Sequence, residues 1–139
     1  MREKRNSDIL AAILGYALEA RCGEGGTHMN GVGHLTKLLL LELCKRTDRY
    51  ALEPDDIELI STAAGLHDIG KVLIPESILK KPGKLTAAEF ELVKQHTTLG
   101  ARLVAEMPAY QNEALVKYII EICLRHHERW NGEGYPDGL

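Results

Sequence analysis

Adjacent histidine and acidic residues are the part of this sequence best suited to chemistry. Six histidines occur among the 139 residues, and two tight pairs stand out, His67–Asp68 and His126–His127. Imidazole nitrogens and carboxylate oxygens are ligands for divalent first-row metals. A carboxylate can bridge two cations, and two successive imidazoles on a helix point about 100° apart. These pairs therefore indicate a site for more than one metal ion.

The elements that must position these residues are expected to be helices. Capping, proline and glycine signals predict helices over 7–21, 27–47, 54–67, 86–105 and 112–128. Pro54 suits a first helical turn, and Thr86 with Glu89 has the pattern of a capping box. Glycines and prolines predict an irregular connection at 70–83 and a loop at 129–139. We therefore expect an all-α fold, a bundle of about five helices with the metal centre in its interior.

Helical periodicity places five of the six histidines on apolar stripes, because residues three or four apart share a helix face. The stripes contain His28 with Val32, Leu35 and Leu39; His67 with Ile57, Ile60 and Ala64; His96 with Leu92, Leu99, Leu103 and Met107; His126 with Leu115, Ile119 and Ile122; and His127 with Val116, Ile120 and Cys123. One such histidine is usually an ordinary core residue. Stripes on four helices instead predict a shared interior, where a cation keeps the imidazoles neutral. His34 is about a third of a turn out of phase with His28 and is expected to point elsewhere.

The ligand types narrow the choice of metal. Nitrogen and oxygen ligands without cysteine favour Fe or Mn over structural zinc, although zinc and nickel also accept such ligands. Glu24, four residues before His28, is within reach of the same centre. Taken alone, Glu24 is explained almost as well as an ordinary solvent-exposed acid beside glycines.

Composition excludes several classes of protein. A length of 139 residues suits one domain, and 45% hydrophobic with 27% charged residues excludes a disordered chain. The net charge of −3 argues against a nucleic-acid coat protein, so no DNA partner is expected. We find no apolar run that could span a bilayer and no signal peptide. The three cysteines lack CxxC spacing and fit reduced thiols, which predicts a cytoplasmic protein.

Four blocks, in order along the chain, resemble the signatures of the HD-GYP subgroup of the HD superfamily of metal-dependent phosphohydrolases. They are the ExR…E…H opening at 19–28, the HDxGK motif at 67–71, the KPGKLT…HT block at 81–97 and the HHExxDGxGYPxGL tail at 126–139. Asn131 replaces the usual Asp of the tail. The resemblance divides the chain into an N-terminal helix at 1–22, suited to a signalling linker, and an HD-GYP domain at 23–139. Because the family domain continues past the GYP tail, the chain is expected to lack its C-terminal helices.

The resemblance implies an enzyme that hydrolyses cyclic di-GMP to pGpG or GMP in bacterial second-messenger signalling. It implies two or three divalent metal ions, most commonly Fe, with Mn as the alternative. The implied metal ligands are Glu24, His28, His67, Asp68, His96, His126 and His127. Asp68 would be the bridging carboxylate, and Lys71 would support the charge that develops on the scissile phosphate.

The resemblance also bears on partners. The loop of Gly134, Tyr135 and Pro136 is associated with substrate contacts and with docking of diguanylate cyclase (GGDEF) domains. Apolar surface and the tail aromatics Trp130 and Tyr135 leave homo-oligomerisation open. The alternative function is a catalytically incomplete HD-GYP module that binds a ligand or partner, because the last family ligand and the substrate clamp are missing. A third hypothesis, a nucleotidase for another nucleotide, is disfavoured by the GYP loop.

Overall fold

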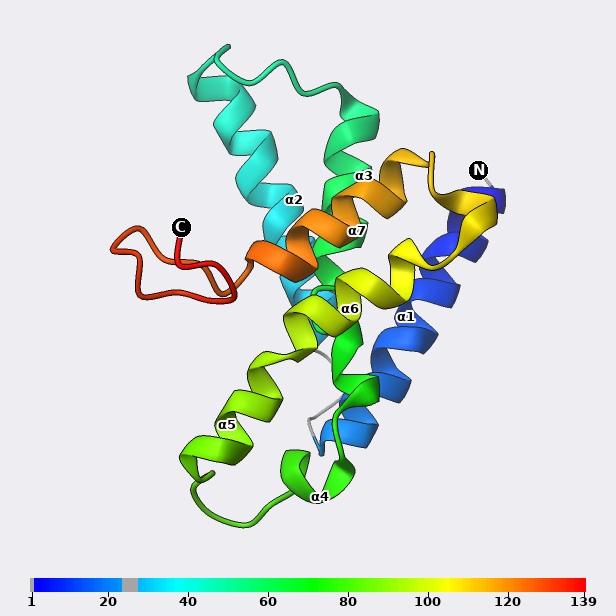
Figure 1. Ribbon diagram of the computed structural model, residues 1–139. Helices are drawn as coiled ribbons and strands as arrows, with labels where there is room; N and C mark the ends of the chain where they lie inside the picture. Colours follow the sequence, from blue (N-terminus) through cyan, green and yellow to red (C-terminus); the bar gives the residue numbers. More distant parts are fainter. Residues whose placement is uncertain (1, 24–27) are drawn as a thin grey trace.

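The computed structural model describes the backbone of residues 2–23 and 28–139, and the side chains of residues 9–23 and 28–139. Within these ranges the regular structure is helical and contains no strand, which confirms the predicted all-α fold (Figure 1). The elements are α1 (Arg2–Cys22), α2 (His28–Arg46), α3 (Pro54–Gly65), η1 (Ile69–Leu73), α4 (Glu76–Leu79), α5 (Ala87–Lys94), α6 (His96–Ala105), η2 (Pro108–Tyr110) and α7 (Ala114–Arg125). The predicted connection at 70–83 thus contains most of the short helix η1 and all of α4.

Two helix starts follow the expected local chemistry. The Thr86 hydroxyl accepts a hydrogen bond from Glu89 N at 3.2 Å, and Thr86 N donates to Glu89 Oε2 at 2.7 Å. This is the predicted capping box at the start of α5. Pro54 occupies the first turn of α3, where Glu53 N donates to Asp56 at 3.0 Å.

The predicted single helix at 86–105 is wrong, because the chain turns at Gln95 between α5 and α6. His96 Nδ1 and Thr97 Oγ1 hydrogen-bond the carbonyls of Val93 and Lys94 at 2.6 and 3.0 Å. Such local side-chain bonds compete with a continuous helix. The predicted row of Leu92, Leu103 and Met107 is consequently exposed, and α6 buries His96, Thr97, Gly100, Ala101 and Val104 instead.

The predicted apolar stripe of α2 is also wrong. Leu35 and Leu39 are 57% and 62% exposed. Helix α2 instead packs on α3 through Gly33, where an added Cβ would lie only 2.8 Å from the carbonyl oxygen of Ser61. The small residue faces the neighbouring helix, so the leucines of the stripe face outward.

The hydrophobic core lies where α3, α6 and α7 meet (Figure 1). Its buried members are Ala63, Ala101, Val104, Val116, Ile119 and Cys123. These include residues of the stripes predicted for the last helix, which confirms its helical phase. The core holds α3, α6 and α7 together.

Helix α1 carries exposed apolar residues as well, namely Ile9, Leu10, Ile13 and Leu14. Neither α1 nor any other helix in the described part of the chain is both long and apolar enough to cross a membrane.

Candidate metal centre

Four side chains from three parts of the fold converge on one point. Asp68 follows α3, His96 begins α6, and His126 and His127 follow α7. Each offers one ligand atom, and these atoms all lie within 4.8 Å of one another. His96 Nε2 and His126 Nε2 lie 3.2 and 3.6 Å from Asp68 Oδ1, and 3.2 Å from each other.

The second carboxylate oxygen of Asp68 has different neighbours. His67 Nε2 lies 3.2 Å from Asp68 Oδ2, and Lys71 Nζ lies 2.8 Å from the same oxygen. The structure therefore brings both residues of the predicted catalytic pair, Asp68 and Lys71, into direct contact.

Backbone carbonyls fix the orientation of three imidazoles. His67 Nδ1 lies 2.7 Å from the carbonyl oxygen of Ala64. The corresponding distances are 2.6 Å from His96 Nδ1 to Val93 O and 3.0 Å from His126 Nδ1 to Ile122 O. Since a carbonyl only accepts, Nδ1 must carry the proton. A neutral ring then leaves the Nε2 lone pair facing Asp68, which is the orientation that a metal-binding histidine needs.

The convergence leaves electron-rich atoms without a proton between them. Asp68 Oδ1 is buried and receives no hydrogen bond of normal geometry from any residue that the structure describes, although two Nε2 atoms are close. Two imidazole lone pairs and a carboxylate oxygen facing one another call for a cation. The residues present therefore fit a divalent metal ion.

The protonation states support the same fit. Burial raises the pKa of the Asp68 carboxyl, but the imidazoles of His126 and His67, which donate hydrogen bonds to the carboxylate when protonated, outweigh burial and hold that pKa well below its usual range. Burial and the nearby His126 lower the pKa of His127 to about 4. An ionised carboxylate and a neutral imidazole are the forms that bind metals.

His28, another predicted ligand, lies beside His67 at the edge of this cluster. The ring of His28 is exposed, and its centroid lies 5.8 Å from that of His67. Glu24 lies outside the described residues.

The predicted GYP loop packs against the cluster. The ring of Tyr135 stacks on His127 with centroids 4.5 Å apart, and Tyr135 N donates to the His127 carbonyl at 3.2 Å. An added Cβ at Gly134 would lie 2.5 Å from Arg129 N, so only glycine allows this approach. Pro136 follows Tyr135 in the same loop.

Gly70 and Gly100, for which the sequence predicts no role, hold the cluster together. An added Cβ at Gly70 would lie 1.9 Å from the carbonyl oxygen of His96 and 2.5 Å from Gly100 N. The backbone after Asp68 therefore touches the first turns of α6. Gly70 is the glycine of the HDxGK motif, so the sequence marks its position. The sequence does not indicate that Gly70 contacts Gly100.

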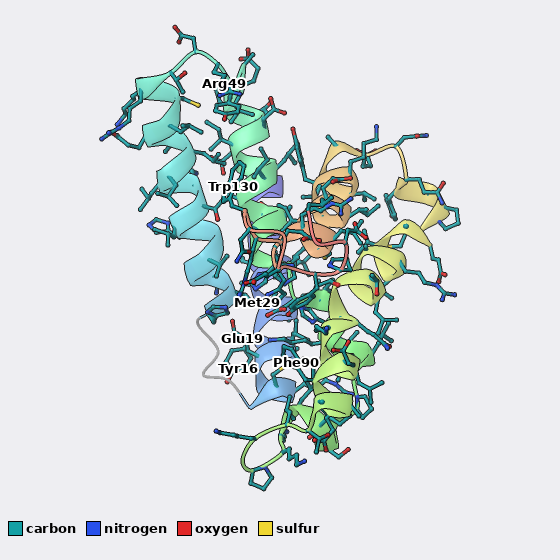
Figure 2. All side chains as sticks on the ribbon, turned by 60° about the vertical axis from the view of Figure 1, so that its left-hand side comes forward. Tyr16, Glu19, Met29, Arg49, Phe90 and Trp130 are labelled. Atoms are coloured by element: carbon teal, nitrogen blue, oxygen red, sulfur yellow. The ribbon has the colours of Figure 1, made fainter. Side chains whose placement is uncertain are left out.

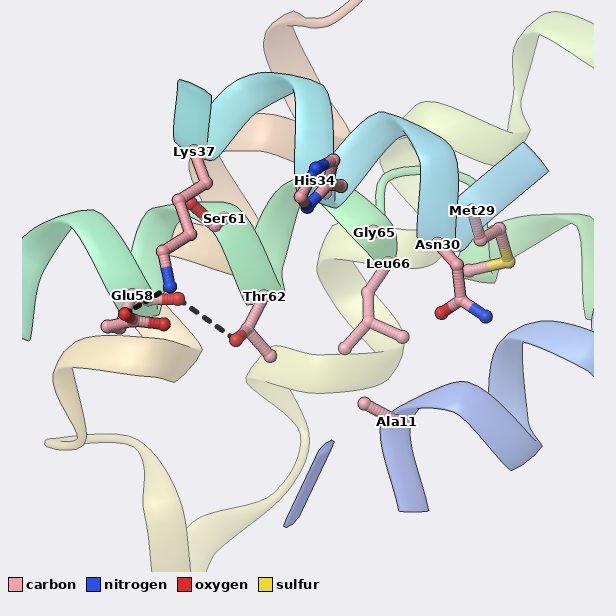
Figure 3. Close-up of a pocket in the computed structure, with 11 residues that line it drawn as sticks. Ala11, Met29, Asn30, His34, Lys37, Glu58, Ser61, Thr62, Gly65 and Leu66 are labelled. Carbon is pink, nitrogen blue, oxygen red and sulfur yellow. Dashed lines mark hydrogen bonds and ion pairs between the residues drawn. The ribbon is translucent and has the colours of Figure 1, made fainter. Parts of the chain in front are cut away.

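His34 lies apart from the cluster, as its helical phase predicts. Figure 3 shows it beside a groove between α2 and α3, near Lys37. The groove has a volume of about 350 Å³. Lys37 pairs there with Glu58, and the hydroxyl of Thr62 donates to the Glu58 carbonyl at 2.9 Å.

Comparison with known proteins agrees with this geometry. A family model described as an HD domain matches residues 27–139. A probable cyclic di-GMP phosphodiesterase of Vibrio cholerae is 42% identical over 139 residues, which cover 97% of this chain and 31% of the relative. A cyclic di-GMP phosphodiesterase of Thermotoga maritima is 42% identical over 127 residues, which cover 91% of this chain and 32% of the relative.

A third relative has a different named substrate. It is a 3'3'-cGAMP-specific phosphodiesterase of Vibrio cholerae, 36% identical over 137 residues that cover 98% of this chain and 24% of the relative. The chain spans about a third of the length of the first two relatives. The family match covers most of the chain. The clustered side chains all belong to the signature blocks at 67–71, 81–97 and 126–139. The chain therefore belongs to the HD domain family, within its HD-GYP subgroup.

Proposed function

We propose that this chain forms part of a metal-dependent phosphodiesterase that hydrolyses cyclic di-GMP to pGpG or GMP in bacterial second-messenger signalling. The observation that carries the proposal is the buried Asp68 carboxylate, which faces the Nε2 atoms of two carbonyl-anchored histidines. The activities for which the relatives are named, all on cyclic dinucleotides, support it.

The metal ligands in this proposal are Asp68, His67, His96, His126 and His127, joined by His28 and Glu24. Two or three divalent ions, with Fe expected and Mn as the alternative, would neutralise the phosphodiester and lower the pKa of a bound water so that hydroxide forms near neutral pH. Asp68 has both oxygens directed at neighbours in the cluster and would be the bridging carboxylate.

Lys71 and Tyr135 are the residues assigned to the substrate side. The Lys71 ammonium lies 2.8 Å from Asp68 Oδ2, so it can exchange this oxygen for a phosphate oxygen and stabilise the charge that develops there. Tyr135 covers one face of His127 and keeps that ring in place. With Gly134 and Pro136 it forms the loop that would contact the dinucleotide.

Two partners belong to the same proposal. A diguanylate cyclase (GGDEF) domain would dock through the loop of Gly134, Tyr135 and Pro136, and Trp130, earlier in the same tail, is fully exposed beside it in sequence. Exposed leucines of α2 and the apolar residues of α1 offer surface for a second copy of the chain.

Turnover by the metal-loaded chain tests the catalytic proposal. The purified chain would be loaded anaerobically with Fe(II) or Mn(II) and incubated separately with cyclic di-GMP and 3'3'-cGAMP, with products separated by chromatography. We expect cyclic di-GMP to be cleaved, and the double variant His67→Ala/Asp68→Ala to be inactive. His34→Ala is the matched control, because it removes a histidine outside the cluster. Exclusive cleavage of 3'3'-cGAMP would correct the substrate, and no turnover of either would favour a binding module.

A further inference from the structure

Glu19 is a buried carboxylate that the proposed function does not use. It lies on α1 with 2% of its surface exposed, and Figure 2 shows it beside Met29 of α2. Glu19 Oε1 accepts a hydrogen bond from Met29 N. Glu19 Oε2 is buried and has no hydrogen-bond partner among the described residues. A buried charge with an uncompensated oxygen costs stability, so its presence needs a reason.

The surroundings of Glu19 connect it to the metal centre. A cavity of about 10 Å³, close to the volume of one water molecule, is lined by Glu19, Asp68, Lys71 and Met29, with Leu18 and Cys22 completing it. Glu19 therefore borders the same small space as the carboxylate and the ammonium at the heart of the cluster.

The bond to Met29 connects Glu19 to the centre by a second route. Met29 is the second residue of α2, and its N–H belongs to the first turn, where N–H groups have no partner within the helix. A carboxylate at this end of a helix is favourable. His28, directly before Met29, places its ring 5.8 Å from that of His67. Glu19 thus fixes the start of the helix that carries a proposed ligand.

We propose that Glu19 is a positioning residue of the metal centre. Its Oε1 holds the start of α2, and its carboxylate, which borders the cavity shared with Asp68 and Lys71, adds negative charge that a cation at the centre would compensate. The inference rests on the proposed metal-dependent function. The charge of Glu19 is therefore expected to lower the stability of the metal-free chain and to raise the affinity of the centre for metal.

Glu19→Gln separates charge from shape, since the amide oxygen still accepts from Met29 N. We expect the metal-free variant to melt at the same temperature as the wild type or higher. We expect its Kd for Mn(II), measured from the electron paramagnetic resonance signal of free Mn(II), to rise roughly 10–100-fold. Glu42→Gln is the matched control, because Glu42 is an exposed carboxylate on α2 that pairs with Arg46. Its Kd should equal that of the wild type.

Two results would overturn the inference. One is a wild-type Kd for Mn(II) in Glu19→Gln, and the other is a metal-free melting temperature that falls together with the affinity, which would give Glu19 a purely structural role. Hydrolysis is assayed separately. A wild-type chain that binds Mn(II) but cleaves no cyclic dinucleotide would contradict the proposed activity, while the difference in Kd would still support the role of Glu19.

Discussion

Asp68 is the residue on which the proposed chemistry of this molecule depends. Its two oxygens face different neighbours, imidazoles of His96 and His126 on one side and Lys71 with His67 on the other. A carboxylate in this position can hold metal with one oxygen and release the lysine from the other. The same arrangement makes Asp68 costly to replace even by its closest isostere.

Replacing Asp68 by Asn should lower metal binding far more than replacing His34 by Ala. Asp68→Asn keeps the shape but removes the charge at the meeting point of the cluster, so we expect at least a tenfold loss of affinity. His34 lies beside the separate groove of α2 and α3, so its removal should leave affinity unchanged. The number of metal ions per chain, measured by mass spectrometry after loading and dialysis, compares the metal binding of the two variants. Equal losses in the two variants would contradict the assigned ligand set.

At the scale of elements, the site depends on contacts between helix ends rather than on helix faces. The η1 turn touches the start of α6 through Gly70 and Gly100, and α7 ends beside both. Cys123 is fully buried in this region, and burial together with the Asp68 charge raises the pKa of its thiol to about 12. The thiol therefore behaves as a core residue and not as a ligand.

Gly70→Ala should disrupt the fold and the site together. The new Cβ would meet the His96 carbonyl at 1.9 Å, which forces η1 and α6 apart at a cost of about 3 kcal/mol. Gly31→Ala is the matched control, because an added Cβ there meets nothing within 4 Å and alanine favours a helix by about 0.5–1 kcal/mol. Urea denaturation measures both free energies of unfolding. A Gly70→Ala chain as stable as the wild type would show that the η1–α6 contact can relax.

Sequence periodicity predicted some of these elements and failed at others for identifiable reasons. The phases of α3 and α7 were right, with Ile57 and Val116 buried, because regular apolar spacing alone sets them. The break at Gln95 was missed because His96 and Thr97 bond carbonyls locally. In the site, short motifs predicted that Asp68 would meet histidines. The carbonyl anchors and the burial of Glu19 depend on three-dimensional contacts that no motif displays.

At the scale of the whole molecule, the clustered side chains come from three helices that pack around one core. Asp68 follows α3, His96 begins α6, and His126 and His127 follow α7. A metal ion bound there would contact each part of the fold that the core of Ala63, Ala101 and Cys123 holds together. Metal occupancy and global stability are therefore expected to be coupled.

Removing the metal should lower the melting temperature of the entire chain in one transition. Free Mn(II) at 100 times its Kd would stabilise the folded state by about 2.7 kcal/mol, provided that the unfolded chain does not bind it. Calorimetry before and after treatment with a chelator measures the shift. At the same Mn(II) concentration Asp68→Asn should show a clearly smaller shift, which corresponds to about 1.4 kcal/mol if its affinity is tenfold weaker. A shift of equal size in that variant would place the stabilising metal elsewhere.

The meeting of His96 and His126 has a consequence for the motions of the folded chain. Their Nε2 atoms lie 3.2 Å apart although 30 residues separate them in sequence. A cation shared by both would act as a reversible cross-link, and closing a loop of this length removes chain entropy worth about 3 kcal/mol. Where a secreted domain uses a disulfide to keep distant segments from fraying, this chain would use its metal. Loss of the ion would then remove this cross-link and let the ends of α6 and α7 fluctuate more widely within the folded chain.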